Sequence, residues 1–98
     1  MTSSNETARG LDGPTDQYAA LCWRWTGERA EVLLVTSRDT GRWVLPKGWP
    51  MPGRAGHEAA EIEAWEEAGV EGRAEAEPIG QFHYDKRLRR NRSVTCRV

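Results

Sequence analysis

The chain has 98 residues, of which 38% are hydrophobic, and a formal net charge of −1. A chain of this length makes one small domain with a modest core. Two cysteines without a CxxC pair argue against a disulfide framework or a zinc site. With no apolar run near the roughly 20 residues of a membrane span and no leader-like start, we expect a cytoplasmic protein without a membrane partner.

The beginning of the chain predicts a disordered tail. Residues 1–16 are rich in Ser, Thr, Gly and Asp and nearly free of large apolar side chains, so they cannot repay the entropy of ordering. The domain is therefore expected over residues 17–98. It is also expected to be incomplete at its C-terminal end, because the chain stops inside an apparent strand.

Strands are expected before and after the middle of the chain. Residues 18–25 and 31–36 are apolar on either side of a turn at Gly27, which predicts a hairpin. The five tryptophans are expected to be mostly core residues or loop anchors. Residues 43–45 and 93–98 are each expected to form a strand, and residues 74–84 are expected to form one or two strands interrupted near Pro78.

A helix is predicted over residues 57–69, after a loop over 47–56 that is rich in glycine and proline. Gly69 suits the left-handed end of that helix. Alanines recur at every fourth position, which favours close packing on a sheet.

Three carboxylates lie on the other face of this helix. Glu63, Glu66 and Glu67 are three and four residues apart, so they form one stripe. Such crowded carboxylates repel one another unless a hard cation such as Mg²⁺ lies among them. A solvated helix face is the alternative interpretation. The glycines at 48 and 69 favour the metal site.

The segment from residue 48 to residue 70 resembles the signature of the Nudix hydrolases. That signature is Gly, five residues, Glu, seven residues, Arg-Glu, an aliphatic residue, any residue, Glu-Glu, any residue, Gly and an aliphatic residue. The matching positions are Gly48, Glu63, Ala64, Glu66, Glu67, Gly69 and Val70. The preceding stretch, residues 42–48, resembles the branch that contains the diphosphoinositol polyphosphate and diadenosine polyphosphate hydrolases.

Two positions depart from the signature. Arg54 stands in place of its first glutamate, and Ile62 stands in place of its arginine. In the family these two residues usually form an ion pair that fixes the loop against the helix, so both partners are missing together. Our hypothesis is that Arg54 instead reaches Glu58 or Glu61.

The resemblance implies an α+β fold, a Nudix-type α/β/α sandwich with a mixed sheet, truncated at its C-terminal end. It also implies Mg²⁺ or Mn²⁺ held by Glu63, Glu66 and Glu67. These three glutamates are the expected catalytic residues, and the general base is not assigned among them.

Positive and small residues before the helix are expected to bind substrate phosphate. Arg42 and Lys47 bracket the strand that leads to Gly48, and a cation there can hold phosphate oxygens. Ser37 and Arg38 stand where the diphosphoinositol branch has a Ser-Arg pair that contacts phosphates. Surface charge is the alternative for Arg42 and Lys47.

The expected function is metal-dependent hydrolysis of a diphosphate linkage in a nucleoside polyphosphate, a dinucleoside polyphosphate or a diphosphoinositol polyphosphate. The alternative is a truncated or degenerate Nudix-like module that binds polyphosphate or RNA 5′ ends without hydrolysis. An unstable remnant is the third hypothesis. The expected partner is a phosphorylated small molecule, with RNA 5′ ends the only nucleic acid considered. A homo-oligomer would cover apolar sheet surface that an abbreviated domain leaves exposed.

Overall fold

A computed structural model describes residues 15–38, 40–89 and 92–98 of the chain. The chain divides into two compact units. The described part of unit 1 comprises residues 15–17 and 79–98, without the gap at 90–91, and unit 2 is Tyr18–Pro78. Most of the expected tail lies outside the described residues. Its last two residues, Thr15 and Asp16, form a strand.

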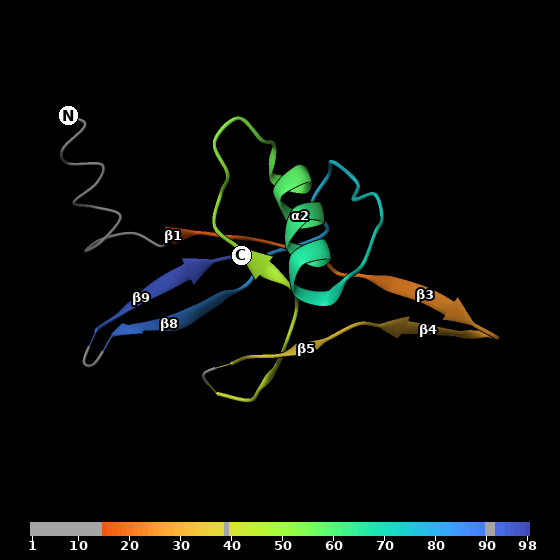
Figure 1. Cartoon of the computed structure of the whole chain (residues 1–98), viewed down its shortest axis with the longest axis horizontal. Coiled ribbons are helices and arrows are strands. Elements are labelled where there is room, and N and C mark those ends of the chain that lie inside the picture. The colour runs from red at the N-terminus through yellow and green to blue at the C-terminus, as the bar shows by residue number, and fades with distance from the viewer. Residues whose placement is uncertain (1–14, 39, 90–91) are drawn as a thin grey trace. The chain divides into compact units, whose positions relative to one another are not determined.

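Unit 1 is a three-stranded sheet of mixed direction (Figure 1). Its strands are β1 (Thr15–Asp16), β8 (His83–Arg89) and β9 (Arg92–Arg97), in the order β1-β9-β8. β8 and β9 form an antiparallel hairpin, and β1 runs parallel to β9. Cys96 of β9 is fully buried between its neighbours Thr15 and Tyr84.

A buried amide side chain connects β1 to the hairpin in unit 1. Gln17 is only 4% exposed, and its Oε1 accepts a hydrogen bond of 2.6 Å from the Tyr84 hydroxyl. Its backbone N–H donates to the Arg97 carbonyl at 2.9 Å. Arg97 Nη2 also pairs with Asp16 Oδ1 at 2.7 Å. The buried polar group is therefore satisfied, as burial requires.

Unit 2 contains six short strands and one helix in the described ranges. The strands pair antiparallel as β2–β7, β3–β4 and β5–β6. The elements are β2 (Tyr18–Ala19), β3 (Trp23–Thr26), β4 (Arg29–Val32), β5 (Val35–Thr36), β6 (Trp43–Val44), β7 (Lys47–Gly48) and α2 (Gly56–Ala68).

The expected first hairpin is present, but each of its expected strands divides in two. Residues 18–25 contain β2 and β3, which pair with different strands, and residues 31–36 likewise contain β4 and β5. The expected loop after Pro46 begins with β7, because Lys47 pairs with Ala19. Residues 74–82 form no strand, which corrects the expectation there. Pro78 and Gly80 interrupt that segment.

Helix α2 agrees closely with its prediction, and both its ends have identifiable hydrogen bonds. Gly69 follows the helix in the left-handed conformation, with φ of 67°, and its N–H donates to the Trp65 carbonyl at 2.9 Å. At the other end, the Ala55 N–H donates to Glu58 Oε1 at 2.8 Å. A glutamate in the first turn also complements the helix dipole.

The small-residue face of α2 packs against the β2–β7 pair (Figure 1). Ala59, Ala60 and Ala64 are all at most 5% exposed. The ring of Tyr18 occupies the place where a side chain at Gly56 would lie. This close approach holds the carboxylate face of the helix next to β7.

None of the five tryptophans is a core residue, which corrects that part of the expectation. All five are between 40% and 69% exposed, namely Trp23, Trp25, Trp43, Trp49 and Trp65. The three small sheets of unit 2 have two strands each, and such pairs offer little area to cover large rings. Aromatic content alone therefore did not indicate burial.

The expected α+β class and mixed strand directions are confirmed. Within residues 15–38, 40–89 and 92–98 there is one helix, so the second helical layer of the expected sandwich is not found there. None of the helical structure described is both long and apolar enough to span a bilayer.

Candidate functional site

Two carboxylates on adjacent turns of α2 form the centre of the candidate site. The carboxylates of Glu63 and Glu67 lie near enough to interact, an arrangement that favours a proton shared between them. Burial of Glu63 and its bond to Glu67, with the nearby charges of Glu67 and Glu66, raise its pKa to about 7. In the absence of a cation, the pair therefore retains a proton close to neutral pH.

Gly48 makes room for one of these carboxylates. A Cβ atom built on Gly48 would overlap the carboxylate of Glu63 and would lie only 2.8 Å from its Oε1. Any larger residue would push the Glu63 side chain away. The glycine of the sequence motif therefore has a direct physical role, which is to let strand backbone and carboxylate meet.

The backbone of β7 also contacts the second carboxylate. The Lys47 N–H donates a hydrogen bond of 3.2 Å to Glu67 Oε1. Together with the contact at Gly48, this bond places β7 against both glutamates. Lys47 itself is half-buried and lies beside the pair.

Glu66 is exposed and contributes to the site through its charge, which raises the pKa of Glu63. Nowhere in the described ranges do three His, Cys, Asp or Glu side chains lie close enough together to hold a metal ion. The structure thus brings together two of the three expected ligands.

The residues present nevertheless fit a divalent cation. A hydrogen-bonded carboxylate pair offers several oxygen atoms, the ligand type that Mg²⁺ and Mn²⁺ prefer. Because Glu63 and Glu67 share a proton at the place where a cation would bind, a cation can replace that proton.

The other predicted phosphate-binding residues lie in the β5–β6 hairpin. The Ser37 N–H donates to the Arg42 carbonyl at 2.7 Å, and the Gly41 N–H donates to the Ser37 carbonyl at 2.8 Å. Arg38 and Arg42 are exposed and form no ion pair with any described residue. Asp39 lies outside the described residues. In this structure no hydrogen bond among the described residues links the hairpin loop to the carboxylate pair.

The hypothetical brace through Arg54 is not observed. Glu58 instead accepts from the Ala55 N–H, and Glu61 Oε2 accepts from the Ala74 N–H at 2.7 Å. Arg54 is exposed and has no ion pair within the part of the chain that the structure describes. Backbone amides, rather than an arginine, thus anchor these two carboxylates of α2.

Tyr18 is a site-positioning residue that the sequence did not reveal. It pairs with Gly48 across the β2–β7 ladder, and its ring lies against Gly56 at the start of α2. It therefore contacts both elements that carry the site. Its only sequence signal was an apolar strand pattern, which does not specify a partner strand.

Helix α2 presents Glu63 and Glu67 to β7, the strand that contains Gly48, and all three residues belong to the sequence motif. The chain matches the model of the NUDIX domain over residues 15–97. The protein therefore belongs to the Nudix family.

Similar curated proteins include diphosphoinositol polyphosphate phosphohydrolase 3-alpha of Mus musculus and the 3-beta protein of Homo sapiens. Each is 37% identical to the chain over 62 residues. The similar region covers 63% of this chain but only 38% of each relative. No solved structure matches the chain.

Proposed function

We propose that this Nudix protein hydrolyses a diphosphate linkage with the help of Mg²⁺ or Mn²⁺. The observation that carries this proposal is the Glu63–Glu67 pair held against Gly48. Carboxylates that share a proton in the absence of metal are arranged as a cation site would need them.

In this proposal Glu63 and Glu67 hold the cation, and Glu66 joins them as the third ligand. When bound, the cation neutralises the diphosphate and lowers the pKa of a coordinated water. A carboxylate oxygen that is not bound to the cation accepts the proton of the attacking water. The proposal leaves open which of the three glutamates does this.

Substrate phosphate would be held by residues that precede the helix. Arg38 and Arg42 are exposed and form no ion pair with any described residue, which supports this role. Lys47 and Gly48 are proposed to contribute because β7 adjoins both carboxylates. Ser37 is included because it pairs across the hairpin with Arg42.

The proposed substrates are nucleoside polyphosphates, dinucleoside polyphosphates and diphosphoinositol polyphosphates. The names of the similar mouse and human proteins support the third class. Residues 17–98 would form the hydrolase domain. The two free thiols, Cys22 and Cys96, favour the reducing cytoplasm as its location.

A second function, binding without hydrolysis, is supported by a specific observation. The family ion pair is replaced at Arg54 and Ile62, and Arg54 has no ion pair among the described residues. Less firmly positioned carboxylates would still bind a polyphosphate through its cation, or an RNA 5′ end. Turnover, which needs accurate placement, would then be lost.

A phosphate-release screen tests the proposal. The three substrate classes are incubated with Mg²⁺, with Mn²⁺ and with chelator. We expect metal-dependent release that falls at least about 100-fold in Glu67→Gln, the loss typical of removing a group of the reaction centre. Glu75→Gln, an exposed glutamate outside the helix, is the matched control.

The three possible results of the screen separate the two functions. Release that depends on metal and on Glu67 supports hydrolysis. Tight binding without release identifies the binding module. Release that is unaffected by chelator or by Glu67→Gln contradicts the proposed site.

A further inference from the structure

The β3–β4 hairpin has one apolar face and one polar face. Trp23 pairs with Val32 and Trp25 pairs with Ala30 across the antiparallel ladder. Residues directly opposite each other, and residues two apart along a strand, point to the same side of a sheet. These four side chains therefore share one face.

The same alternation extends the apolar face beyond the paired residues. The Leu33 N–H donates to the Cys22 carbonyl at 2.9 Å, so the ladder continues by one further pair. Continued by one more residue on each side, the alternation would place Leu21 and Leu34, each 43% exposed, on the side of Trp23. We call the resulting surface the tryptophan face. It consists of Leu21, Trp23, Trp25, Ala30, Val32 and Leu34.

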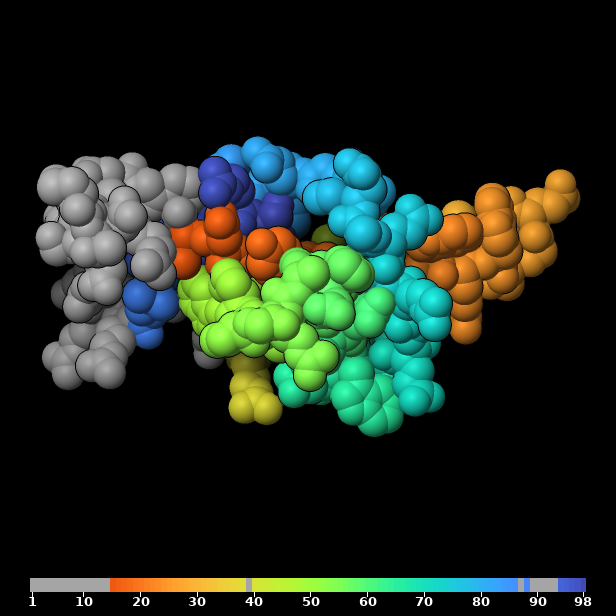
Figure 2. Space-filling view, turned by 90° about the horizontal axis from the view of Figure 1, so that it is seen from above, coloured from red at the N-terminus to blue at the C-terminus, as the bar shows by residue number. Residues whose placement is uncertain are grey.

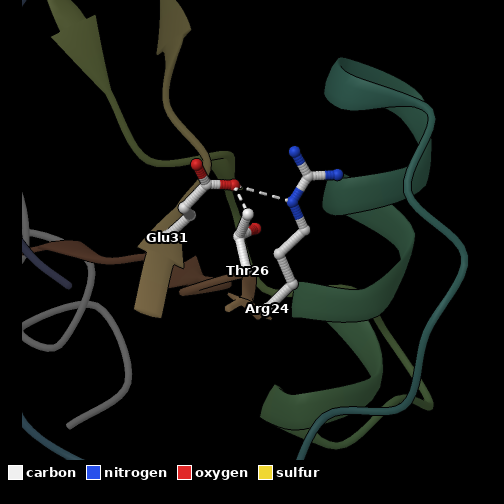
Figure 3. A network of polar contacts seen from close by, with 3 residues as sticks. All are labelled: Arg24, Thr26 and Glu31. Carbon is white, nitrogen blue, oxygen red and sulfur yellow. Dashed lines mark hydrogen bonds and ion pairs between the residues drawn. The ribbon is translucent and has the colours of Figure 1, made fainter. Parts of the chain in front are cut away.

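The side chains of the polar face form hydrogen bonds with one another. Arg24 Nε and Thr26 Oγ1 both donate to Glu31 Oε1, each at 2.9 Å (Figure 3). The hydrogen bonds from Arg24 and Thr26, together with the charge of Arg24, hold the pKa of Glu31 below its ordinary value. Arg29 lies opposite Thr26, so the charged side chains of the two strands all lie on this face and none lies on the tryptophan face.

The tryptophan face is open to solvent. Trp23 and Trp25 are 58% and 64% exposed and contact each other edge to face, with ring centroids 5.8 Å apart. On the side seen in Figure 2, most of the orange atoms of the hairpin are uncovered. β3 and β4 pair only with each other among the described strands, and an isolated two-stranded hairpin is marginal in water.

The size of this face suits a second copy of the chain. From the usual area of an aromatic side chain, its exposed apolar surface is on the order of 500 Å². That is near the upper limit for one patch on a monomer, about 600 Å². A standard interface takes about 800 Å² from each partner, roughly two thirds of it apolar in homodimers. The face supplies that apolar share.

Charge also permits two copies to meet. The formal net charge of the chain is only −1, so repulsion between copies is weak. The apolar face can lie on its own symmetry mate, with its indoles stacked across the two-fold axis. The charged Arg24–Glu31 side would remain in water.

We propose that the chain forms a homodimer through the tryptophan face of its β3–β4 hairpin. This inference is independent of the proposed hydrolysis, because none of its residues belongs to the candidate site. It predicts that self-association depends on the side chains of this face.

Sedimentation equilibrium of the 98-residue chain, from about 1 to about 300 μM, tests the proposal. We expect a monomer–dimer equilibrium with a dissociation constant in the micromolar range, about that of a small interface. Ala30→Lys places a charge on the face opposite Trp25 and should raise the dissociation constant at least about 10-fold. Trp25→Thr, which suits a strand, should act in the same direction.

Trp43→Thr is the matched control, because Trp43 is a strand tryptophan of β6 that is 69% exposed and lies outside the hairpin. It should associate like the unchanged chain. A chain that stays monomeric throughout the range overturns the proposal. So does an Ala30→Lys variant that dimerises normally, or a Trp43→Thr variant that dissociates.

Hydrogen exchange on the unchanged chain keeps the test decisive if the variants fail to fold. On dilution from the dimeric to the monomeric range, amides of β3 and β4 should exchange faster, while amides of the β8–β9 hairpin should not change. Equal acceleration in both hairpins, or in neither, contradicts the tryptophan face as the interface.

Discussion

At the residue scale, the candidate site depends on the absence of a side chain at Gly48 as much as on the glutamate side chains that are present. The carboxylate of Glu63 occupies the position that any Cβ on Gly48 would take. The obstruction would be the mobile end of a side chain and not backbone, so a substitution should move the carboxylate more than it disturbs the fold. Position 48 therefore allows binding and stability to be separated.

Gly48→Ala should weaken Mg²⁺ binding about 10-fold or more, the loss usual when the surroundings of a metal ligand are altered. Its Tm should change by no more than a few degrees, because Glu63 can rotate away. Calorimetric titration with Mg²⁺ and a thermal melt measure the two effects. Gly72→Ala is the control, since nothing lies within 4 Å of its added Cβ.

The raised pKa of Glu63 gives the metal-free protein a defined dependence on pH. The folded chain releases this proton near pH 7, whereas an unfolded glutamate ionises near 4.5. The folded state therefore binds the proton more tightly between these values. The stabilisation is complete below about pH 4.5, and it is lost as the pH rises through about 7.

The urea midpoint of unfolding, measured with chelator from pH 5 to pH 8, should show this loss. Glu63→Gln should remove this pH-dependent part of the stability, because the amide of the glutamine can donate a hydrogen bond to Glu67 but does not titrate. The informative quantity is the difference between the two proteins, because every other group contributes equally to both curves. Parallel curves for the two proteins would contradict the assignment.

At the element scale, helix α2 was predictable and its partner strands were not. Glutamate spacing, small residues at every fourth position and Gly69 are all local signals, and each corresponds to a feature of the structure. The close approach of Gly48 and Glu63 was not predicted, although both residues belong to the sequence motif. The partner of β7, in contrast, is β2, almost thirty residues earlier. No local pattern specifies such a pairing.

The contact between Tyr18 and Gly56 determines how α2 lies on β2. A Cβ on Gly56 would come within 2.7 Å and 2.9 Å of ring atoms of Tyr18. Gly56→Ala should therefore destabilise the protein by about 1–2 kcal/mol. The cost of overpacking, about 1–3 kcal/mol, exceeds the gain in helix propensity, which is at most about 1 kcal/mol.

A double-mutant cycle with Tyr18→Ala checks the cause. Without the ring, Gly56→Ala should become neutral or stabilising in a denaturant titration, because the added methyl then has space. If Gly56→Ala were equally harmful in both backgrounds, the ring would not be responsible, and backbone effects at the helix start would have to be considered.

At the scale of the whole molecule, metal binding should appear as stability. A ligand that binds only the folded chain adds about 1.4 kcal/mol at ten times its dissociation constant. We therefore expect Mg²⁺ to raise the Tm progressively and chelator to reverse the change. Glu67→Gln should abolish the shift and Glu75→Gln should keep it. An Mg²⁺ effect of equal size in both variants would indicate binding elsewhere.

The sequence also did not predict which of the large apolar residues are buried and which are exposed. Trp23 and Trp25 have the alternation of a half-buried strand, and that pattern was correctly interpreted as a hairpin. Whether a hairpin face is covered depends on what lies over it, which is a tertiary or quaternary property. Composition therefore overestimated the core, which within the described residues is made mainly of alanines and Cys96.

The hydrogen bond from the Lys47 amide to Glu67 provides a reporter within the site. An amide proton that donates to a carboxylate changes its resonance frequency when the charge on that carboxylate changes. The NMR signal of the Lys47 amide should therefore follow proton loss from the adjacent Glu63 near pH 7 and occupation of the site by a cation.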